Sequence, residues 1–169
     1  MKRVLVLGSP GAGKSTLAAQ LATRTGLPLI HLDQQYWQAG WVEPDKESWR
    51  ARVAEIAARD EWIIDGNYGG TLAVRLARAD TVILLDFPTH LCLLRVLRRS
   101  VTGRGRVRPD MAEGCPERFD PAFFTYVARY RRDAGRRNGR LLENFSGQLI
   151  RLRRPREIER LLASFDKRG

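Results

Sequence analysis

Eight residues near the N-terminus have the types and spacing needed to hold a chain of phosphates: Gly8-Ser9-Pro10-Gly11-Ala12-Gly13-Lys14-Ser15. Glycines let the backbone turn with its N–H groups pointing inward, toward a single anion. A helix that starts directly after such a loop adds the positive end of its dipole. The segment fits the pattern G-x-x-x-x-G-K-[ST], and it therefore predicts a nucleoside triphosphate, ATP or GTP, as the ligand.

Two side chains of this phosphate loop, residues 8–15, carry the expected chemistry. Lys14 places a full positive charge beside the β- and γ-phosphates, so we predict a catalytic role for it. The hydroxyl of Ser15 is placed to bind Mg²⁺, and Thr16 extends the predicted nucleotide-binding segment. ATP and Mg²⁺ are therefore the expected cofactors of a phosphoryl transfer.

The segments on either side of the phosphate loop are those that would position it. Residues 4–7 are aliphatic at consecutive positions, as in a strand that is buried on both faces. Residues 15–25 place Leu17 and Leu21 at helical spacing, and Gly26 ends the helix. A strand, a glycine loop and a helix in this order distinguish the segment from a chance glycine turn.

The remainder of the chain alternates apolar strand patterns with amphipathic helix patterns. Further strands are expected at residues 29–32, 62–64, 81–85 and 149–152, and further helices from residue 45, at 71–77, from 89 to about 100, from 121 to near Gly139, and at 155–165. About five alternations predict a parallel sheet covered by helices on both faces, the three-layer αβα arrangement. The length of 169 residues suits one α/β domain, residues 1–169.

Three aspartates follow apolar strand patterns: Asp33, Asp65 and Asp86. Ligands of parallel sheets gather at the carboxyl ends of the strands, so all three are expected near the phosphate loop. Of these, Asp65 is the predicted partner of Mg²⁺, acting through a metal-bound water. Capping of the next helix is the alternative for each, and it is strongest for Asp86, because Phe87-Pro88 and a helix follow.

The phosphate loop, Asp65-Gly66 and Leu85-Asp86-Phe87-Pro88 together resemble the adenylate kinase and nucleoside monophosphate kinase group. The chain resembles still more closely the bacterial DNA topology modulation (FlaR-type) proteins, which are small P-loop kinases related to adenylate kinase. That second resemblance rests on His31-Leu32-Asp33, Tyr36-Trp37 with Gly40-Trp41, Trp62-Ile63-Ile64-Asp65-Gly66-Asn67-Tyr68, and residues 108–119. It spans nearly the full chain. The phosphate loop is common to many families, whereas the other stretches are more specific.

The resemblance implies a P-loop NTPase fold like that of nucleoside monophosphate kinases, with a five-stranded sheet of order 2-3-1-4-5. It also implies an acceptor-binding arm at about residues 33–60 and a short lid at about residues 103–118. The lid segment is rich in Gly, Arg and Pro and has no apolar period, which indicates a mobile loop. Closing such a lid would exclude water, which otherwise competes as the phosphoryl acceptor.

The resemblance also implies roles for several arginines. Arg95 matches a residue that flanks adenine in adenylate kinases, and Arg99 matches one that contacts phosphate. Arg118 and Arg129 have the spacing of two arginines that clamp the transferring phosphoryl group there. We therefore predict catalytic roles for Arg99, Arg118 and Arg129, with a solvated surface charge as the alternative for each. Two neighbouring arginines could replace Arg129 in the clamp: Arg131 and Arg132.

The acceptor decides the role of Asp33, which follows the second strand pattern and is also a predicted catalytic residue. A nucleotide phosphate is already ionised and needs no base, whereas a hydroxyl needs a carboxylate that orients it and takes its proton. The nearby aromatic residues Tyr36, Trp37 and Trp41 could stack on a ring of the acceptor or pack the arm against the next helix. A nucleotide kinase and another small-molecule kinase are therefore both open.

The chain is strongly basic, with a formal net charge of +11 from 30 Lys and Arg against 19 Asp and Glu. This charge favours an anionic partner, either a nucleotide or a nucleic acid, although an arginine-rich solvated surface would give the same balance. One alternative function is a nucleotide-binding, DNA-associated regulator whose stretches 95–108 and 129–140 track a phosphate backbone. No helix-turn-helix or zinc pattern supports it. A P-loop ATPase that drives a partner is the third hypothesis.

The cysteines and the apolar runs bear on location. Cys92 and Cys115 stand outside any CxxC pair, which favours two reduced thiols over a zinc site. No apolar run approaches the length of a membrane span. Residues 1–7 begin like a signal peptide, but the apolar run is too short and ends at the glycine loop. We therefore expect a cytoplasmic protein with no membrane partner.

Overall fold

The central strand of the sheet is β1 (Arg3–Gly8), because its aliphatic residues find apolar neighbours on both faces. Val4 and Val6 contribute to the core on one face of the sheet, and Leu5 and Leu7 contribute to the core on the other. The computed structural model describes residues 1–166 of the chain.

Five parallel strands form the sheet, and their order is β2-β3-β1-β4-β5, as predicted. The other strands are β2 (Leu29–His31), β3 (Trp62–Asp65), β4 (Thr81–Leu85) and β5 (Gln148–Leu152). Val6 of β1 is in register with Asp65 on one side and with Ile83 on the other. The carboxyl ends of these strands therefore meet at the same edge of the sheet, where the phosphate loop begins.

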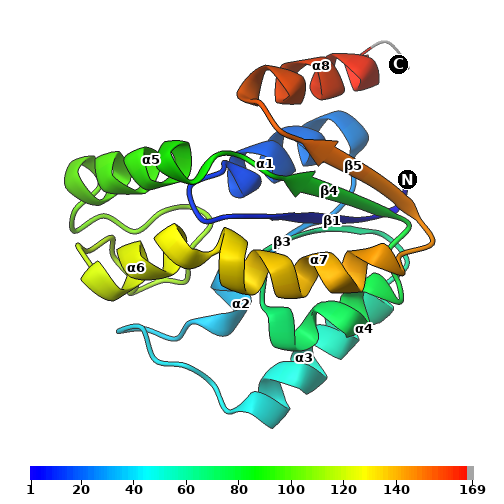
Figure 1. The fold of residues 1–169 in the computed structure, drawn as a ribbon. Helices are drawn as coiled ribbons and strands as arrows, with labels where there is room; N and C mark the ends of the chain where they lie inside the picture. Colours follow the sequence, from blue (N-terminus) through cyan, green and yellow to red (C-terminus); the bar gives the residue numbers. More distant parts are fainter. Residues whose placement is uncertain (167–169) are drawn as a thin grey trace.

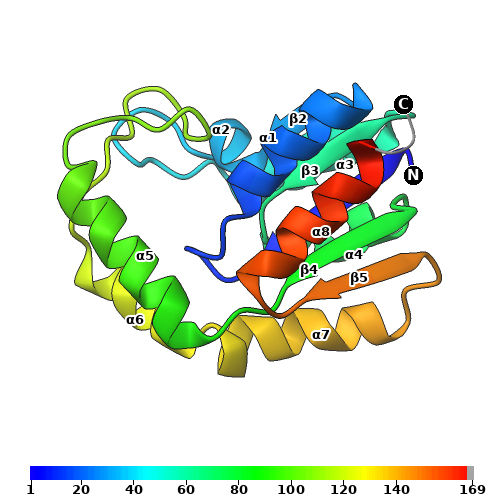
Figure 2. The same ribbon diagram turned by 90° about the horizontal axis from the view of Figure 1, so that it is seen from above.

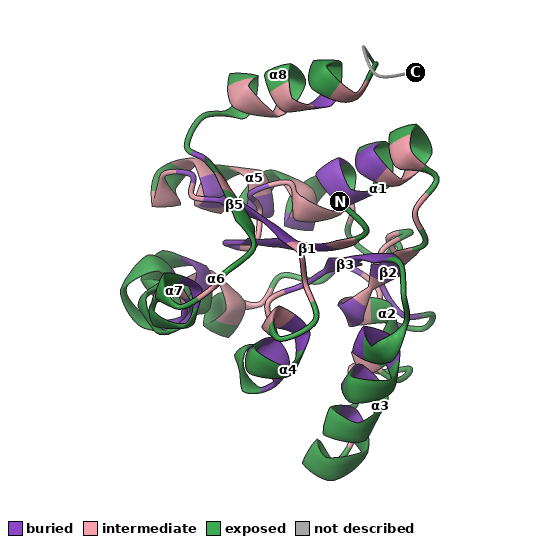
Figure 3. Ribbon diagram, turned by 90° about the vertical axis from the view of Figure 1, so that its right-hand side faces the viewer, coloured by how far each residue is buried: buried purple, intermediate pink, exposed green. Residues whose placement is uncertain are grey.

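Helices cover both faces of the sheet, which confirms the predicted three-layer αβα arrangement (Figures 1 and 2). One face carries α1 (Lys14–Thr25), α5 (Thr89–Thr102) and α8 (Pro155–Asp166). The opposite face carries α3 (Lys46–Ala58), α4 (Leu72–Leu76) with the short 3₁₀ turn η1 (Gly69–Thr71) before it, and α7 (Arg136–Glu143). Figure 3 shows the central strands buried between the two layers and the outer surface of α3 exposed.

The segment after β2 differs from the prediction. The strand ends at His31, and a five-residue helix, α2 (Leu32–Tyr36), replaces the end of the expected strand at residue 32. Leu32 extends an apolar run that fits the pattern of a strand. Its side chain is fully buried, but its backbone is already helical. The helix turns the chain away from the sheet and places Asp33 in its first turn.

The helix expected from residue 121 to near Gly139 continues to Glu143 and contains a wider turn. It is divided into α6 (Pro121–Arg129), the π-helical turn η2 (Arg131–Gly135) and α7. The N–H of Gly135 donates to the carbonyl of Tyr130 (2.6 Å), five residues earlier, which is the spacing of a π turn. Gly139 lies within α7, so this glycine does not end the helix.

The predicted lid, residues 103–118, has no helix or strand, but it is packed against the arm. Three buried lid side chains, Met111, Ala112 and Cys115, contact two arm tryptophans, Trp37 and Trp41. The N–H of Gly40 donates to the carbonyl of Gly114 (2.9 Å). The sequence pattern did not reveal this packing, because the buried lid residues follow no regular spacing.

The structure also gives facts about membrane spans and cysteines. No helix within residues 1–166 is long and apolar enough to span a bilayer. Cys92 and Cys115 are both buried and form no disulfide.

Candidate active site

The phosphate loop connects β1 to α1 and turns sharply at three glycines. Gly8, Gly11 and Gly13 have φ angles of 145°, 79° and 97°, in the region that favours glycine. A Cβ at Gly8 would lie 2.5 Å from the carbonyl oxygen of Leu85, and one at Gly11 would overlap the carbonyl of Cys92. The first two glycines are therefore needed for space as well as for conformation.

Lys14 is the cation of this loop. Its Nζ donates a hydrogen bond to the carbonyl oxygen of Ser9 (3.2 Å). Burial lowers the pKa of the ammonium group, while the carboxylates of Asp65 and Asp33 oppose that shift. The loop amine and two carboxylates that follow or end neighbouring strands therefore share one electrostatic environment.

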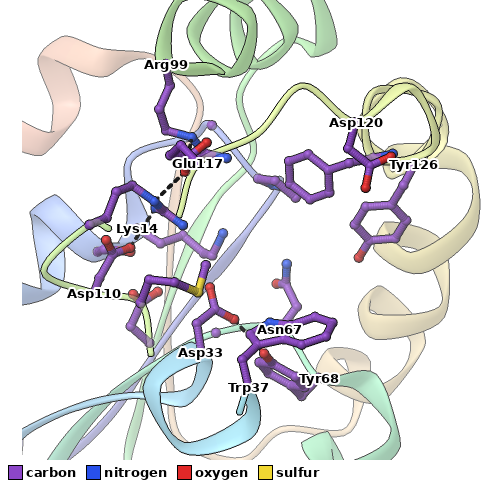
Figure 4. Close-up of a pocket in the computed structure, with 18 of the residues that line it drawn as sticks. Lys14, Asp33, Trp37, Asn67, Tyr68, Arg99, Asp110, Glu117, Asp120 and Tyr126 are labelled. Atoms are coloured by element: carbon purple, nitrogen blue, oxygen red, sulfur yellow. Dashed lines mark hydrogen bonds and ion pairs between the residues drawn. The ribbon is translucent and has the colours of Figure 1, made fainter. Parts of the chain in front are cut away.

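The phosphate loop forms one wall of a cavity of about 810 Å³ at the carboxyl edge of the sheet (Figure 4). The other walls come from α2, the turn after β3, the lid, α5, α6 and α7. The predicted site residues that line it are Pro10, Gly11, Gly13, Lys14, Ser15, Thr16, Asp33, Asp65, Arg95, Arg99 and Arg118. Gly8, Ser9 and Ala12 belong to the loop but not to the cavity wall. The volume is within the range of small-molecule sites.

Asp33 reaches the cavity from the first turn of α2. The hydroxyl of Tyr68 donates a hydrogen bond to its Oδ1 (2.6 Å). Burial raises the pKa of the Asp33 carboxyl, while the Tyr68 hydrogen bond and the charge of Lys14 oppose the rise. The tyrosine fixes one carboxylate oxygen and leaves the other to face a ligand.

The turn after β3 joins Tyr68 to the phosphate loop. The side chain of Asn67 brackets Gly8, because its Oδ1 accepts from the Gly8 N–H (3.2 Å) and its Nδ2 donates to the Gly8 carbonyl (2.8 Å). Arg75 is fully buried and donates to the three consecutive carbonyls of residues 66–68. Burial lowers the pKa of its guanidinium to about 9, so it remains charged at neutral pH. Arg75 therefore anchors the turn and takes no part in the cavity wall.

Asp65 and Ser15 are the residues predicted to hold Mg²⁺, and both line the cavity. Asp65 ends β3 and is 5% exposed. Its Oδ2 lies 3.1 Å from Nδ1 of His31, while its Oδ1 is buried without a hydrogen-bond partner in residues 1–166. A metal-bound water would satisfy this oxygen. No three His, Cys, Asp or Glu side chains form a metal cage in that part of the chain, so Mg²⁺ would be held through Ser15, water and the phosphates.

The lid contributes a charge cluster that sequence reasoning missed. Oε1 of Glu117 lies 3.0 Å from Nε of Arg99 and 2.6 Å from Nε of Arg108. Nη1 of Arg108 also donates to Oδ2 of Asp110 (2.9 Å). All four residues line the cavity, and Figure 4 shows the cluster beside Lys14. Arg99 was a predicted catalytic residue, but for Arg108, Asp110 and Glu117 the only signal was the stretch 108–119, which supported a resemblance and assigned them no role.

Arg95 and Arg118 both line the cavity, and each is held by a different part of the chain. Nη1 of Arg95 donates to the carbonyl of Ala12 (3.2 Å), which holds this arginine against the phosphate loop. The guanidinium of Arg118 lies 5.1 Å from the ring centre of Trp41 and 3.7 Å from Oδ2 of Asp120. Arg118 therefore connects the end of the lid to the arm.

The other predicted clamp arginine, Arg129, lies on the exposed surface of α6 and does not line the cavity. Neither of its proposed substitutes lines the cavity, and Arg131 pairs with Asp86 (3.2 Å). Arg137 of α7 faces the cavity instead. Spacing along the sequence could not identify Arg137, because the wider turn η2 changes which side of the helix faces the cavity.

The aromatic residues of the arm divide between two roles. Tyr36 packs between Trp49 of α3 and Tyr68, with ring centres 5.0 and 4.8 Å away. Trp37 and Trp41 contact each other, with ring centres 5.3 Å apart, and both line the cavity. Packing against α3 therefore accounts for Tyr36, whereas the two tryptophans pack against the lid and also line the cavity.

No protein-family model matches the sequence. A curated relative, the shikimate kinase of Rhodococcus jostii (strain RHA1), is 31% identical over 144 residues, which cover 77% of this chain and 80% of that protein. The chain belongs to the shikimate kinase-like family of P-loop kinases.

Solved structures of other P-loop kinases share the fold. The shikimate kinase from Bacteroides thetaiotaomicron superimposes with a TM-score of 0.57 and 17% identity, covering 98% of this chain and 96% of that chain. A gluconokinase from Sinorhizobium meliloti 1021 gives a TM-score of 0.52 and 15% identity, covering 99% and 92%. At these identities the likeness concerns the fold alone.

The predicted class of P-loop kinase is therefore confirmed. The predicted P-loop NTPase fold is confirmed as well. The narrower resemblance to the DNA topology modulation proteins stays a prediction, because the relatives found are named as shikimate kinases and a gluconokinase.

Proposed function

We propose that this P-loop kinase transfers the γ-phosphoryl group of ATP to a hydroxyl group of a small molecule. The supporting observation is the position of Asp33, whose carboxylate lines the same cavity as Lys14 and is held by Tyr68. A hydroxyl oxygen resting on this carboxylate would attack the γ-phosphorus while its proton passes to Asp33. The bond between the γ-phosphorus and the bridging oxygen breaks, and ADP leaves.

The carboxylate favours a hydroxyl acceptor over a phosphate acceptor. A phosphate monoester is already ionised at neutral pH, so it needs no base, and an ionised Asp33 would repel it. The relatives support a small-molecule acceptor, since they are kinases named for shikimate and for gluconate. A nucleotide kinase of the adenylate type is therefore the less well supported reading.

On the donor side, the N–H groups of the phosphate loop would hold the triphosphate. Arg95 would flank the base, while Arg99 and Arg108 would reach the phosphates from the lid side. Ser15 directly and Asp65 through water would hold Mg²⁺, which when bound neutralises charge on the phosphate oxygens.

On the acceptor side, the cavity offers both apolar and polar groups. Trp37 and Trp41 contribute aromatic side chains to its lining, and Arg137 adds a cation from α7. Oδ1 of Asn138 is buried and has no hydrogen-bond partner within residues 1–166. These groups suit an acceptor with a ring or a chain that carries several polar substituents.

The relatives give no support to the alternative of a DNA-associated regulator. Part of the Arg-rich sequence is also engaged within the protein, since Arg99 and Arg108 pair with Glu117 and Arg131 pairs with Asp86. A nucleic acid is therefore not needed to explain these charges.

A screen of hydroxyl-bearing metabolites, nucleosides and nucleotides with ATP and Mg²⁺, read by mass spectrometry, tests the proposal. We expect one or a few acceptors to gain a phosphoryl group on a hydroxyl, together with ADP. Lys14→Ala should abolish this product while the circular dichroism spectrum is unchanged, because the side chain serves the ligand. Inorganic phosphate as the sole product would indicate an ATPase, and transfer to the phosphate of a nucleotide would contradict the role of Asp33.

A further inference from the structure

Glu117 is a buried carboxylate in a cavity suited to anionic phosphates. It is 7% exposed, and its Oε1 contacts the guanidinium groups of both Arg99 and Arg108, at 3.0 and 2.6 Å. Buried acidic side chains are rare unless they are paired. An anion at this position would weaken phosphate binding if it only neutralised the arginines, so its place in the cavity needs another reason.

The geometry of the two contacts supplies a reason for the position of Glu117 in the cavity. Nε is the nitrogen of each arginine that lies nearest to Glu117, in an ion pair that does not have the alignment of a hydrogen bond. A guanidinium has a planar fork of five N–H donors, so a carboxylate at Nε leaves the terminal nitrogens available to a second anion. Within residues 1–166, the terminal nitrogens of Arg99 make no hydrogen bond, and of those of Arg108 only Nη1 makes one, to Asp110 (2.9 Å). Glu117 therefore holds the two arginines while most of their terminal N–H groups remain available to a ligand.

Glu117 is itself fixed by the backbone at the base of the lid. Its N–H donates to the carbonyl of Arg106 (2.9 Å), and its carbonyl accepts from the N–H of Gly105 (3.0 Å). These hydrogen bonds join the first and last parts of the lid, so the backbone that carries the Glu117 carboxylate is held in place. A rigid carboxylate can restrict a long arginine side chain, which otherwise has much rotational freedom to lose on binding.

Charge gives Glu117 a second effect on the pair. Burial and then the nearby charge of Arg108 lower the pKa of Arg99, and Glu117 opposes this shift. Without the carboxylate, two partly buried cations would repel each other, and each would turn toward solvent. Glu117 keeps them side by side.

We propose that Glu117 is a positioning residue that holds Arg99 and Arg108 with their terminal nitrogens toward the γ-phosphate. The inference rests on the proposed function, because it places a nucleoside triphosphate on the phosphate loop. Glu117 does not touch the nucleotide. A competing role, in which Glu117 occupies the arginines until ATP displaces it, makes the opposite prediction for affinity.

Calorimetry in the presence of Mg²⁺ with ADP and with a non-hydrolysable ATP analogue tests this role without knowledge of the acceptor. The unaltered protein should bind the analogue about tenfold more tightly than ADP, through charge-assisted hydrogen bonds to the γ-phosphate. Glu117→Gln should lose about tenfold in affinity for the analogue and change that for ADP by less than about twofold. Glu113→Gln, an exposed carboxylate in the same lid, is the matched control and should behave as the unaltered protein.

A double-mutant cycle shows whether Glu117 acts through the arginines. In an Arg99→Ala, Arg108→Ala background, Glu117→Gln should cost less than about threefold in affinity for the analogue. Thermal unfolding checks that each variant folds. Should Glu117→Gln fail to fold, Glu117→Asp, which keeps the charge and shortens its reach, gives the same comparison of ADP with the analogue.

The inference would be overturned by tighter binding of the analogue by Glu117→Gln, by an equal loss for ADP and the analogue, or by a full cost in the arginine-free background. Equal affinity of the unaltered protein for ADP and the analogue would also overturn it. Failure of the unaltered protein to bind any nucleotide would instead refute the proposed function, so the two failures are distinguishable.

Discussion

Asp33 is the side chain on which the proposed chemistry depends most. It faces the cavity because β2 stops at His31 and α2 begins, so that the aspartate lies in the first helical turn. Burial raises the pKa of the Asp33 carboxyl, and two neighbours oppose this rise, because the Tyr68 hydroxyl and the Lys14 charge favour the ionised form. A carboxylate that is both oriented and harder to ionise than usual is suited to accept a proton.

Replacement of Asp33 by asparagine should separate catalysis from stability. Asp33→Asn removes the base but keeps an oxygen that can accept the Tyr68 hydrogen bond, so kcat should fall by about 10²- to 10⁴-fold. Burial raises the pKa of Asp33 above its unfolded value, so its ionised form destabilises the folded chain at neutral pH. The neutral variant should therefore keep or raise the melting temperature in differential scanning calorimetry. Unchanged kcat with a lower melting temperature would contradict this assignment.

The pH dependence of kcat/KM should report the same carboxyl. The base must be ionised, so the rate falls as the pH drops through its pKa, which lies above the ordinary value of 3.8. The Tyr68 hydrogen bond lowers that pKa, so Tyr68→Phe should move the acid limb of the profile to higher pH. Tyr36→Phe, from the same aromatic cluster but without a bond to Asp33, should leave it in place. An acid limb that stays or moves down in Tyr68→Phe would refute the role of this pair.

At the scale of elements, the backbones of the lid and the arm approach each other closely at Gly114, whose carbonyl accepts from the N–H of Gly40 (2.9 Å). Gly114 has a φ of 76°, and a Cβ there would lie 2.8 Å from the Cβ of Ala39. Gly105 has nearly the same φ, 77°, but a Cβ there would meet nothing within 4 Å. The two lid glycines therefore differ in their neighbours and not in their backbone conformation.

Alanine at these two glycines should distinguish lid packing from backbone strain. Each substitution places a side chain in the left-handed region, at a cost of about 1 kcal/mol in the free energy of unfolding. Gly114→Ala should in addition push the lid from the arm and lower kcat/KM for the acceptor about tenfold more than Gly105→Ala does. The emission of Trp37 and Trp41 should shift to longer wavelength in Gly114→Ala alone. Equal kinetics in the two variants would mean that the contact has no part in the reaction.

Elements with a strong local signal were predictable, and those set by distant contacts were not. The β1 strand, the phosphate loop and α1 each have their own pattern, and the sheet order implied by the resemblance is confirmed. The short helix α2 was missed, because Leu32 extends an apolar run that also fits a strand. The π turn η2 leaves no periodic signal of its own in the sequence.

The site was predictable to the extent that its residues follow strands. Lys14, Asp33 and Asp65 stand at or beyond the carboxyl ends of strands and come together in the cavity. Glu117 gave no such signal, because its two arginine partners lie on α5 and within the irregular lid. Among many arginines, spacing alone selected Arg129, which the structure leaves outside the cavity.

At the scale of the whole molecule, the sheet edge, the lid and the α6–α7 helix enclose one cavity, and the proposed function divides its lining into two chemically different halves. The phosphate loop and the lid arginines form the half that suits phosphates. Asp33, the arm tryptophans and α7 form the half that suits a hydroxyl compound. Because the arm packs against the lid through a shared core, the two halves are parts of one enclosure.

The central claim is that the γ-phosphoryl group moves directly to a hydroxyl of the acceptor. ATP isotopically labelled in that group, incubated with the protein, Mg²⁺ and the acceptor found by screening, tests it by mass spectrometry of the product. The claim predicts that the labelled phosphoryl group appears as an ester on the acceptor hydroxyl, and that Asp33→Asn suppresses its appearance. Label found only in inorganic phosphate, at a rate that the acceptor does not change, would contradict it.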